Sequence, residues 1–145
     1  MKASYCVSQA ELNRRPSMTK NRRQVMALLQ QKNTAMSAYE VIEALQQDYD
    51  TSLYPMAAYR ALDFLRQMQC VLHLRTINKF IYVENSQPTF WQVLICDKCQ
   101  QIEKYAFSHA VAHPLLQQPN STFHTRDNHI ELHGLCHSCV NTTDS

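Results

Sequence analysis

Six cysteines occur in this 145-residue sequence, and four of them form two matched pairs. The pairs are Cys96-Asp97-Lys98-Cys99 and Cys136-His137-Ser138-Cys139. Two C-x-x-C pairs present four thiolates in the arrangement that tetrahedral zinc accepts, with Zn–S bonds of about 2.3 Å. The stretch between the pairs is longer than in a compact zinc ribbon, so a small domain must fold between them. Because four sulfur ligands leave zinc no open position, we expect a structural zinc at Cys96, Cys99, Cys136 and Cys139.

Thiol redox chemistry is the main alternative for these cysteines. A C-x-x-C pair can exchange disulfides when the pKa of one thiol is depressed. A thioredoxin-like site, however, needs one such pair beside a β-α-β unit, whereas this sequence has two matched pairs. The pattern favours a metal site and a protein that is not an enzyme and has no small-molecule substrate. A zinc-stabilised thiol redox enzyme remains the alternative from another functional class.

A Tyr-Arg pair at Tyr59 and Arg60 is the second group with recognisable chemistry. Arginine can bind guanine through two hydrogen bonds or hold a phosphate, and tyrosine can donate to a phosphate or contact the methyl group of thymine. Taken alone, such a pair is more often an ordinary solvated helix face. Its place on the third of three predicted helices, followed by a hairpin, favours contact with DNA.

The elements that position these residues can be predicted from caps and apolar spacing. The first 70 residues predict three helices, each with apolar residues at helical spacing behind a polar cap. The predicted caps are Thr19, then Ser37 with Glu40 as a capping box, then Thr51 or Ser52 ahead of Pro55.

Two β-rich runs, VLHLR and KFIYVE, follow the third helix and predict a hairpin. Three helices and a hairpin are typical of a winged helix, whose third helix enters the major groove. We therefore predict an α+β protein with a winged-helix DNA-binding domain at residues 1–84. The polar segment 85–89 is the predicted hinge, and residues 90–145 form a second domain with three strands and a short helix.

Composition and charge restrict the class of protein further. Hydrophobic residues make up 45% and charged residues 18% of the chain, an ordinary balance for a folded protein. Apolar runs are too short for a membrane span, and the first residues lack the apolar core of a signal peptide, so we expect a cytoplasmic protein. Residues 1–85 hold eleven Lys/Arg against seven Asp/Glu, and the remainder holds three against five. This imbalance fits a nucleic-acid-binding front half, although random surface variation could also produce it.

The stretches SAYEVIEALQQ, PMAAYRALDFL, ICDKC and NHIELHGLCHSC resemble the ferric/zinc uptake regulator (Fur) family, most closely its zinc uptake regulator (Zur) branch. The similarity runs in order from about residue 19 to residue 139. It implies a homodimer in which residues 90–145 form an α/β dimerisation domain with the four-cysteine zinc site. It also implies four DNA-binding residues, which are Tyr59 and Arg60 on the recognition helix, and Tyr39 and Arg22 near the DNA backbone.

The sequence departs from the family at the regulatory metal site near the hinge, where His, Cys and Glu ligands are expected. The matching positions hold Leu72, Val83, Phe90 and Lys104. Neighbouring residues that could supply a remodelled site are His73, Glu84 and Glu103, although a shift by one residue along a strand reverses the face of a side chain. Two further family positions differ, a helix-start threonine that is Ala57 here and a glycine that is Gln100.

The main hypothesis is a metal-responsive repressor of zinc-uptake genes that binds palindromic double-stranded DNA as a homodimer and has no membrane partner. The first alternative is a family member whose sensor site is lost or remodelled and which does not respond to zinc. A zinc-stabilised protein-interaction module that does not bind DNA is a further alternative. It predicts no affinity for duplex DNA even at low salt.

Overall fold

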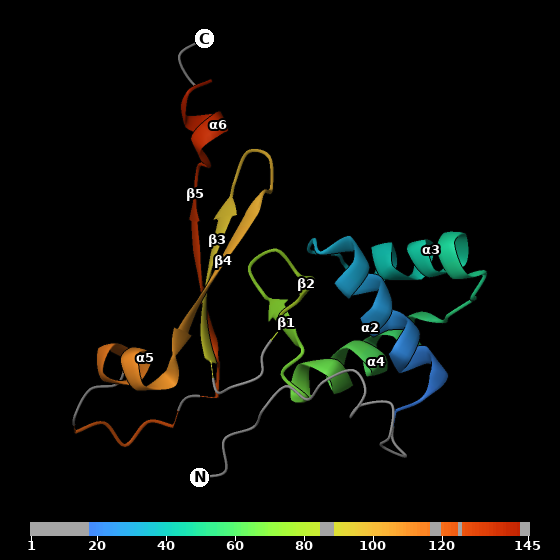
Figure 1. The fold of residues 1–145 in the computed structure, drawn as a ribbon, viewed down its shortest axis with the longest axis horizontal. Coiled ribbons are helices and arrows are strands. Elements are labelled where there is room, and N and C mark those ends of the chain that lie inside the picture. The colour runs from blue at the N-terminus through green and yellow to red at the C-terminus, as the bar shows by residue number, and fades with distance from the viewer. Residues whose placement is uncertain (1–17, 85–88, 117–119, 125, 143–145) are drawn as a thin grey trace. The chain divides into compact units, whose positions relative to one another are not determined.

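The computed structural model describes residues 18–84, 89–116, 120–124 and 126–142 (Figure 1). Helices precede strands along the chain, which confirms the predicted α+β class. None of the described helices is long and apolar enough to cross a membrane. The elements are α2 (Lys20–Lys32), α3 (Ala38–Tyr49), α4 (Pro55–Gln67), β1 (Val71–Leu74), β2 (Lys79–Tyr82), β3 (Thr89–Cys96), β4 (Ile102–Ser108), α5 (His109–Leu116), β5 (His129–Gly134) and α6 (His137–Val140).

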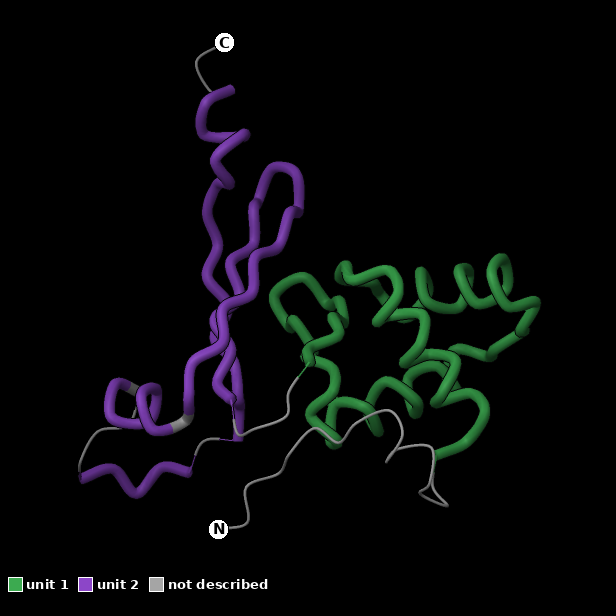
Figure 2. The backbone as a smooth tube through the Cα atoms, in the orientation of Figure 1, with its two compact units in different colours: residues 1–87 green, residues 88–145 purple. Residues whose placement is uncertain are grey.

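The chain divides into two compact units, residues 1–87 and residues 88–145 (Figure 2). The first unit packs α2, α3 and α4 against one another and against the hairpin of β1 and β2. Its core comes from the apolar positions at helical spacing. These are Val25, Leu28 and Leu29 of α2, Val41 and Leu45 of α3, and Ala58, Leu62 and Leu65 of α4, all of them buried.

Two of the three helix starts have the predicted caps. Thr19 Oγ1 accepts the Arg22 N–H at 3.3 Å at the start of α2. At α3, Ser37 Oγ accepts the Glu40 N–H at 3.2 Å, and Glu40 Oε2 accepts the Ser37 N–H at 2.6 Å, which completes the capping box.

The predicted cap of the third helix is wrong. The N-cap of α4 is Tyr54, and its side chain makes no capping hydrogen bond. The Thr51 hydroxyl instead donates to the Tyr49 carbonyl at 3.2 Å. Pro55 occupies the first turn of α4 as predicted, and its fixed φ explains why the helix begins there and not at Thr51.

The hairpin is antiparallel, with Leu72 opposite Ile81 and His73 opposite Phe80. It is joined to the start of α3 by two independent contacts. A β-bridge pairs Met36 with Phe80, and the Lys79 ammonium lies 3.3 Å from Glu40 Oε1. The β1–β2 hairpin is the wing of the predicted winged helix. It is attached to the helical part of its unit at Glu40, the residue that also caps α3.

The second unit is a three-stranded sheet in the order β4-β3-β5. Strands β3 and β4 are antiparallel, whereas β5 runs parallel to β3 after a connection that contains α5. Alternate β3 residues, Trp91, Val93 and Ile95, are buried on one face of the sheet. Of the predicted hinge, residues 85–88 lie outside the described part of the chain, and Thr89 is the first residue of β3.

Candidate metal centre and nucleic-acid interface

The two cysteine pairs meet at one end of the three-stranded sheet. The first pair begins at Cys96, the last residue of β3, and the second pair lies on α6 directly after β5. Because β3 and β5 are parallel, with Cys96 opposite Gly134, the segments that follow the two strands emerge side by side. The Asp97 N–H donates to the Gly134 carbonyl at 2.8 Å and ties these segments together.

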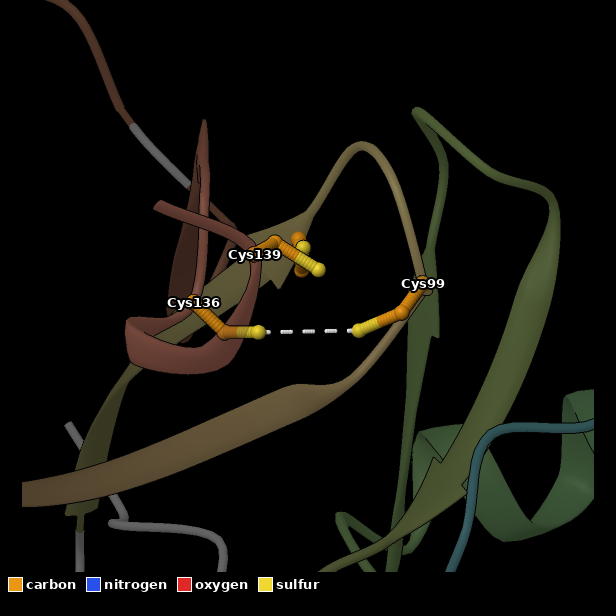
Figure 3. A group of neighbouring side chains, drawn as sticks. Cys99, Cys136 and Cys139 are labelled. Atoms are coloured by element: carbon orange, nitrogen blue, oxygen red, sulfur yellow. Dashed lines mark hydrogen bonds between the residues drawn. The ribbon is translucent and has the colours of Figure 1, made fainter. Parts of the chain in front are cut away.

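The four cysteine sulfurs converge on one point. Their Sγ atoms all lie within 4.8 Å of one another, and Cys99 Sγ and Cys136 Sγ are 3.6 Å apart (Figure 3). Zn–S bonds of about 2.3 Å in a tetrahedron place the sulfurs about 3.8 Å apart. The cluster is thus close to the size of a zinc site, and small side-chain rotations would complete it. Among the described residues, this is the group of His, Cys, Asp and Glu whose ligand atoms converge.

The environments of the four thiols differ. Backbone N–H groups of Cys99 and Cys136 stabilise the Cys96 thiolate and lower the pKa of Cys96 to about 6. The neighbouring Cys136 thiol, together with burial, raises the pKa of Cys139 to about 12. Four thiolates so close together repel one another, so full ionisation requires a cation between them. A divalent metal satisfies this requirement and displaces the protons.

Further contacts hold the two cysteine pairs in place. His133 Nδ1 lies 2.7 Å from Asp97 Oδ1 and connects β5 to the first pair. The Lys98 ammonium donates to Thr142 Oγ1 at 3.4 Å and connects the first pair to the end of α6. Since four sulfurs fill a tetrahedral shell, the chemistry that this centre supports is cross-linking of the fold.

The second candidate site is the solvent-facing side of α4. Tyr59 and Arg60 are both exposed there, whereas Ala58, Ala61 and Leu62 on the opposite side are buried. Arg60 makes no hydrogen bond or ion pair with any described residue. Its guanidinium therefore keeps all its donors available for an acceptor outside the chain.

Two residues predicted near the DNA backbone occupy other helices of the same unit. Tyr39, in the first turn of α3, is 65% exposed. Arg22, in the first turn of α2, is half-buried, and its guanidinium carbon lies 4.0 Å from the centroid of the Phe64 ring. The ring supports Arg22 by a cation–π contact, which limits the conformations that its side chain can adopt.

A model of the ferric uptake regulator family matches residues 14–133. The chain belongs to the ferric uptake regulator family. Its relatives include the zinc uptake regulation proteins of Escherichia coli (strain K12) and Shigella flexneri. Each is 31% identical over 127 residues, which cover 85% of this chain and 72% of the relative.

Solved structures of the ferric uptake regulator family have the same fold. A zinc uptake regulator complexed with zinc and DNA matches with a TM-score of 0.70 at 26% identity, over 93% of this chain and 97% of that one. The Helicobacter pylori ferric uptake regulator, whose structure reveals three functional metal binding sites, matches with a TM-score of 0.65 at 18% identity. The latter match covers both chains completely and supports the fold alone.

Membership of the ferric uptake regulator family decides between the functional classes. The family consists of transcription regulators, so the chain is a regulator and not a thiol redox enzyme. The four-cysteine cluster accordingly fits a role in the fold of a regulator.

The three residues predicted for a remodelled sensor, His73, Glu84 and Glu103, lie on different elements. His73 of β1 stacks on Phe80, with ring centroids 4.4 Å apart, and His73 Nε2 lies 3.0 Å from Asn78 Oδ1. Glu84 is exposed after β2. Glu103 of β4 accepts a 2.7 Å hydrogen bond from the Tyr105 hydroxyl. His73 and Glu103 therefore each have a partner within their own unit, and a regulatory site at these residues stays a prediction.

Sequence reasoning missed two features of these sites. Met56, in the first turn of α4, is exposed on the side that carries Tyr59 and Arg60. Its position three and four residues before the Tyr-Arg pair was the available signal. Gln100, directly after the first cysteine pair, has a φ of 63°, in the left-handed region. The glycine expected at this position in the family was the signal for that conformation.

Proposed function

We propose that the chain is a cytoplasmic, metal-responsive repressor of zinc-uptake genes that binds palindromic operator DNA as a homodimer. Relatives named zinc uptake regulation proteins support this proposal, as does a solved zinc uptake regulator complexed with zinc and DNA. The observation that carries it is Arg60, an exposed cation on the third helix of a winged helix that has no acidic partner among the described residues. An arginine in this situation is suited to guanine or phosphate.

In this proposal α4 enters the major groove and the flanking helices hold the DNA backbone. Tyr59 and Arg60 contact base edges or phosphates, and Tyr39 and Arg22 contact the backbone. The Phe64 ring beneath Arg22 supports such a role, because the cation–π contact orients the guanidinium. DNA binding is expected to weaken with salt, since phosphate neutralisation supplies much of the affinity.

The four-cysteine cluster holds a structural zinc in this proposal, with Cys96, Cys99, Cys136 and Cys139 as ligands. The convergence of four sulfurs to within 4.8 Å supports it. When bound, the metal supplies a cross-link between the end of β3 and α6, two segments that are far apart in the sequence.

A homodimer is supported by an exposed apolar face of the sheet in the second unit. The β-register puts Tyr105, Gln92 and Ile130 in one row across the three strands, with Leu94 and Leu132 in the next row. Tyr105, Ile130 and Leu132 are exposed there. A second copy of the chain would remove this apolar surface from water, and a twofold dimer matches a palindromic site.

A regulator that has lost its zinc response is the second candidate, and specific observations favour it. At positions where the family has metal ligands, Leu72 and Val83 are fully buried hydrocarbon side chains. Burial also lowers the pKa of Lys104, a half-buried cation at a third such position. A remodelled sensor would therefore have to use the neighbours His73, Glu84 and Glu103.

The experiment is a zinc titration of protein that carries only its four-cysteine metal, with binding to an AT-rich palindromic duplex followed by fluorescence anisotropy. A steep gain in affinity with zinc would support a working sensor. Tight binding without zinc dependence would support the second candidate. Failure to bind in both states would contradict the choice of operator or of metal.

Two arginines of α4 form a matched pair of variants for the same assay. Arg60→Ala should weaken binding by about fivefold or more, because an arginine–guanine contact contributes about 1–3 kcal/mol. Arg66→Ala is the control, because Arg66 is already paired with Asp63 at 2.7 Å. Unchanged affinity of Arg60→Ala, as expected for Arg66→Ala, would remove Arg60 from the interface.

A further inference from the structure

Met56 is a large apolar side chain held in solvent at the start of α4. It is 66% exposed in the first turn of the helix. Three other methionines of the same unit, Met18, Met26 and Met36, are buried in its core. An isolated exposed apolar residue is common on protein surfaces, so exposure alone carries no conclusion.

Met56 lies on the same face of α4 as the predicted DNA-binding residues Tyr59 and Arg60. Residues three and four apart lie on one face of a helix, so Met56 continues the row of Tyr59 and Arg60 toward the helix N-terminus. At the other end of this row, the polar side chains form hydrogen bonds with one another. Asp63 accepts hydrogen bonds from Arg66 at 2.7 Å and from Gln67 at 2.8 Å. The half of the row that is open to a partner consists of Met56, Tyr59 and Arg60.

The residues around Met56 at the start of α4 make no competing use of this surface as a cap. The N-cap Tyr54 makes no side-chain capping bond, and the next residue after Met56 is the small, half-buried Ala57. In helix-turn-helix proteins the N-terminal residues of the recognition helix contact base edges. The apolar group that the major groove offers there is the C5-methyl of thymine.

We propose that Met56 is a specificity-determining residue that contacts a thymine methyl group in the operator. This rests on the proposed DNA-binding function and adds the kind of base that the helix start prefers. One helical turn is about 5.4 Å long, and base pairs are about 3.4 Å apart. The thymine is therefore one or two base pairs from the position that Arg60 contacts.

The test removes the methyl group from the DNA and the thioether from the protein in turn. A duplex is first selected by the wild-type protein from a random library in the presence of zinc. Each thymine is then replaced by deoxyuridine, at symmetric positions, and affinities are measured for wild type, Met56→Ala, Met56→Leu and the control Gln30→Ala on exposed α2 surface. Alanine and leucine both favour helix, so α4 is retained in the two Met56 variants, which circular dichroism checks.

The expected result is a loss of about fourfold per half-site for wild type at one thymine, the equivalent of one buried methyl group. Met56→Ala should bind thymine and uracil equally at that position, whereas Met56→Leu and Gln30→Ala should keep the preference. Specific binding with the same profile in Met56→Ala would overturn this inference and leave the proposed function standing. Absence of a selected duplex for the wild type would overturn both.

Discussion

Three basic residues of the first unit have a carboxylate partner that Arg60 lacks in the described part of the chain. Lys32, Lys79 and Arg66 each have a carboxylate within 3.3 Å, at Asp48, Glu40 and Asp63 respectively. Arg60 has no such partner among the described residues. Surface ion pairs contribute only about 0–1 kcal/mol to stability. Pairing matters here mainly because a cation that binds a carboxylate of its own chain is less available to a phosphate or a base. The available positive charge of α4 is thereby concentrated at Arg60.

Gln100 provides a prediction about backbone strain at the metal centre. A non-glycine residue in the left-handed region costs about 1–2 kcal/mol, and Gln100 has a φ of 63° there. Gln100→Gly should stabilise the zinc-bound second unit by about 1 kcal/mol, with part of the gain offset by the greater freedom of glycine in the unfolded chain. Urea unfolding followed by the fluorescence of Trp91, the single tryptophan, measures this unit.

The adjacent Gln101 is the control for this substitution. Gln101 is not in the left-handed region, and its carbonyl accepts the Cys96 N–H at 2.9 Å. Gln101→Gly should therefore destabilise the unit slightly. A loss of stability in both variants would mean that the conformation of Gln100 carries no relievable strain.

The sequence predicted metal chemistry better than it predicted side-chain exposure. The convergence of the four sulfurs follows from local C-x-x-C spacing and from the limited ligand preferences of zinc. The exposure of Met56 depends on where α4 begins and which of its faces packs on α2 and α3, which is a tertiary property. The hydrogen bond between His73 and Asn78 depends on the hairpin register, which places them across a tight turn.

At the level of elements, the cap of α3 was predicted correctly from two residues that define it together. Ser37 with Glu40 three residues later gives a reciprocal pattern, and both hydrogen bonds form. Thr51 and Ser52 have no Glu or Gln three residues later, since Tyr54 and Pro55 occupy those positions. A lone cap-type residue was sufficient at Thr19, which caps α2, but not at Thr51 or Ser52, where the proline at the first turn decided the start of α4.

Glu40 couples the start of α3 to the wing and gives a pH-dependent prediction. The Ser37 N–H has the largest effect on Glu40 and, together with the Lys79 ammonium, lowers its pKa below the ordinary value of 4.5, while burial opposes the shift. A depressed carboxyl pKa contributes stability that is present above the unfolded pKa and is lost as pH falls through the folded value. Glu40→Gln should therefore destabilise the first unit at pH 7 by less than about 1 kcal/mol, because the carboxylate is exposed.

The measurement is urea unfolding followed by helical circular dichroism, which the three helices of the first unit dominate. The difference between wild type and Glu40→Gln should shrink as pH falls below 4.5 and through the lowered pKa of Glu40, where the wild-type carboxylate becomes protonated. Glu43→Gln on the same helix is the control, since within the described part of the chain its carboxylate accepts one long hydrogen bond, from Gln47 at 3.5 Å. A difference that is unchanged at low pH would show that the charge of Glu40 has no role.

For the whole molecule, the division into two units means that each has its own source of stability. The first unit has a core of buried aliphatic side chains from three helices. The second is a three-stranded sheet in which the parallel partner β5 follows a long connection, and the two cysteine pairs close that connection. Long-range strand pairing carries a loop-closure cost, which a metal cross-link offsets.

Loss of the four-cysteine metal should consequently unfold one unit and spare the other. Structural zinc contributes about 10 kcal/mol or more of apparent binding free energy, which is available only to the folded site. Cys136→Ser should abolish zinc binding and expose the buried Trp91, whose emission should shift to the red. Light scattering should show that the proposed dimer is lost, whereas most of the helical circular dichroism should be retained. Ser138→Ala, an exposed residue of the same pair that bears no ligand, should behave as wild type. A zinc-free Cys136→Ser protein that keeps both its blue-shifted Trp91 emission and its dimer would contradict the proposed role of the metal, because the sheet would then hold together without it.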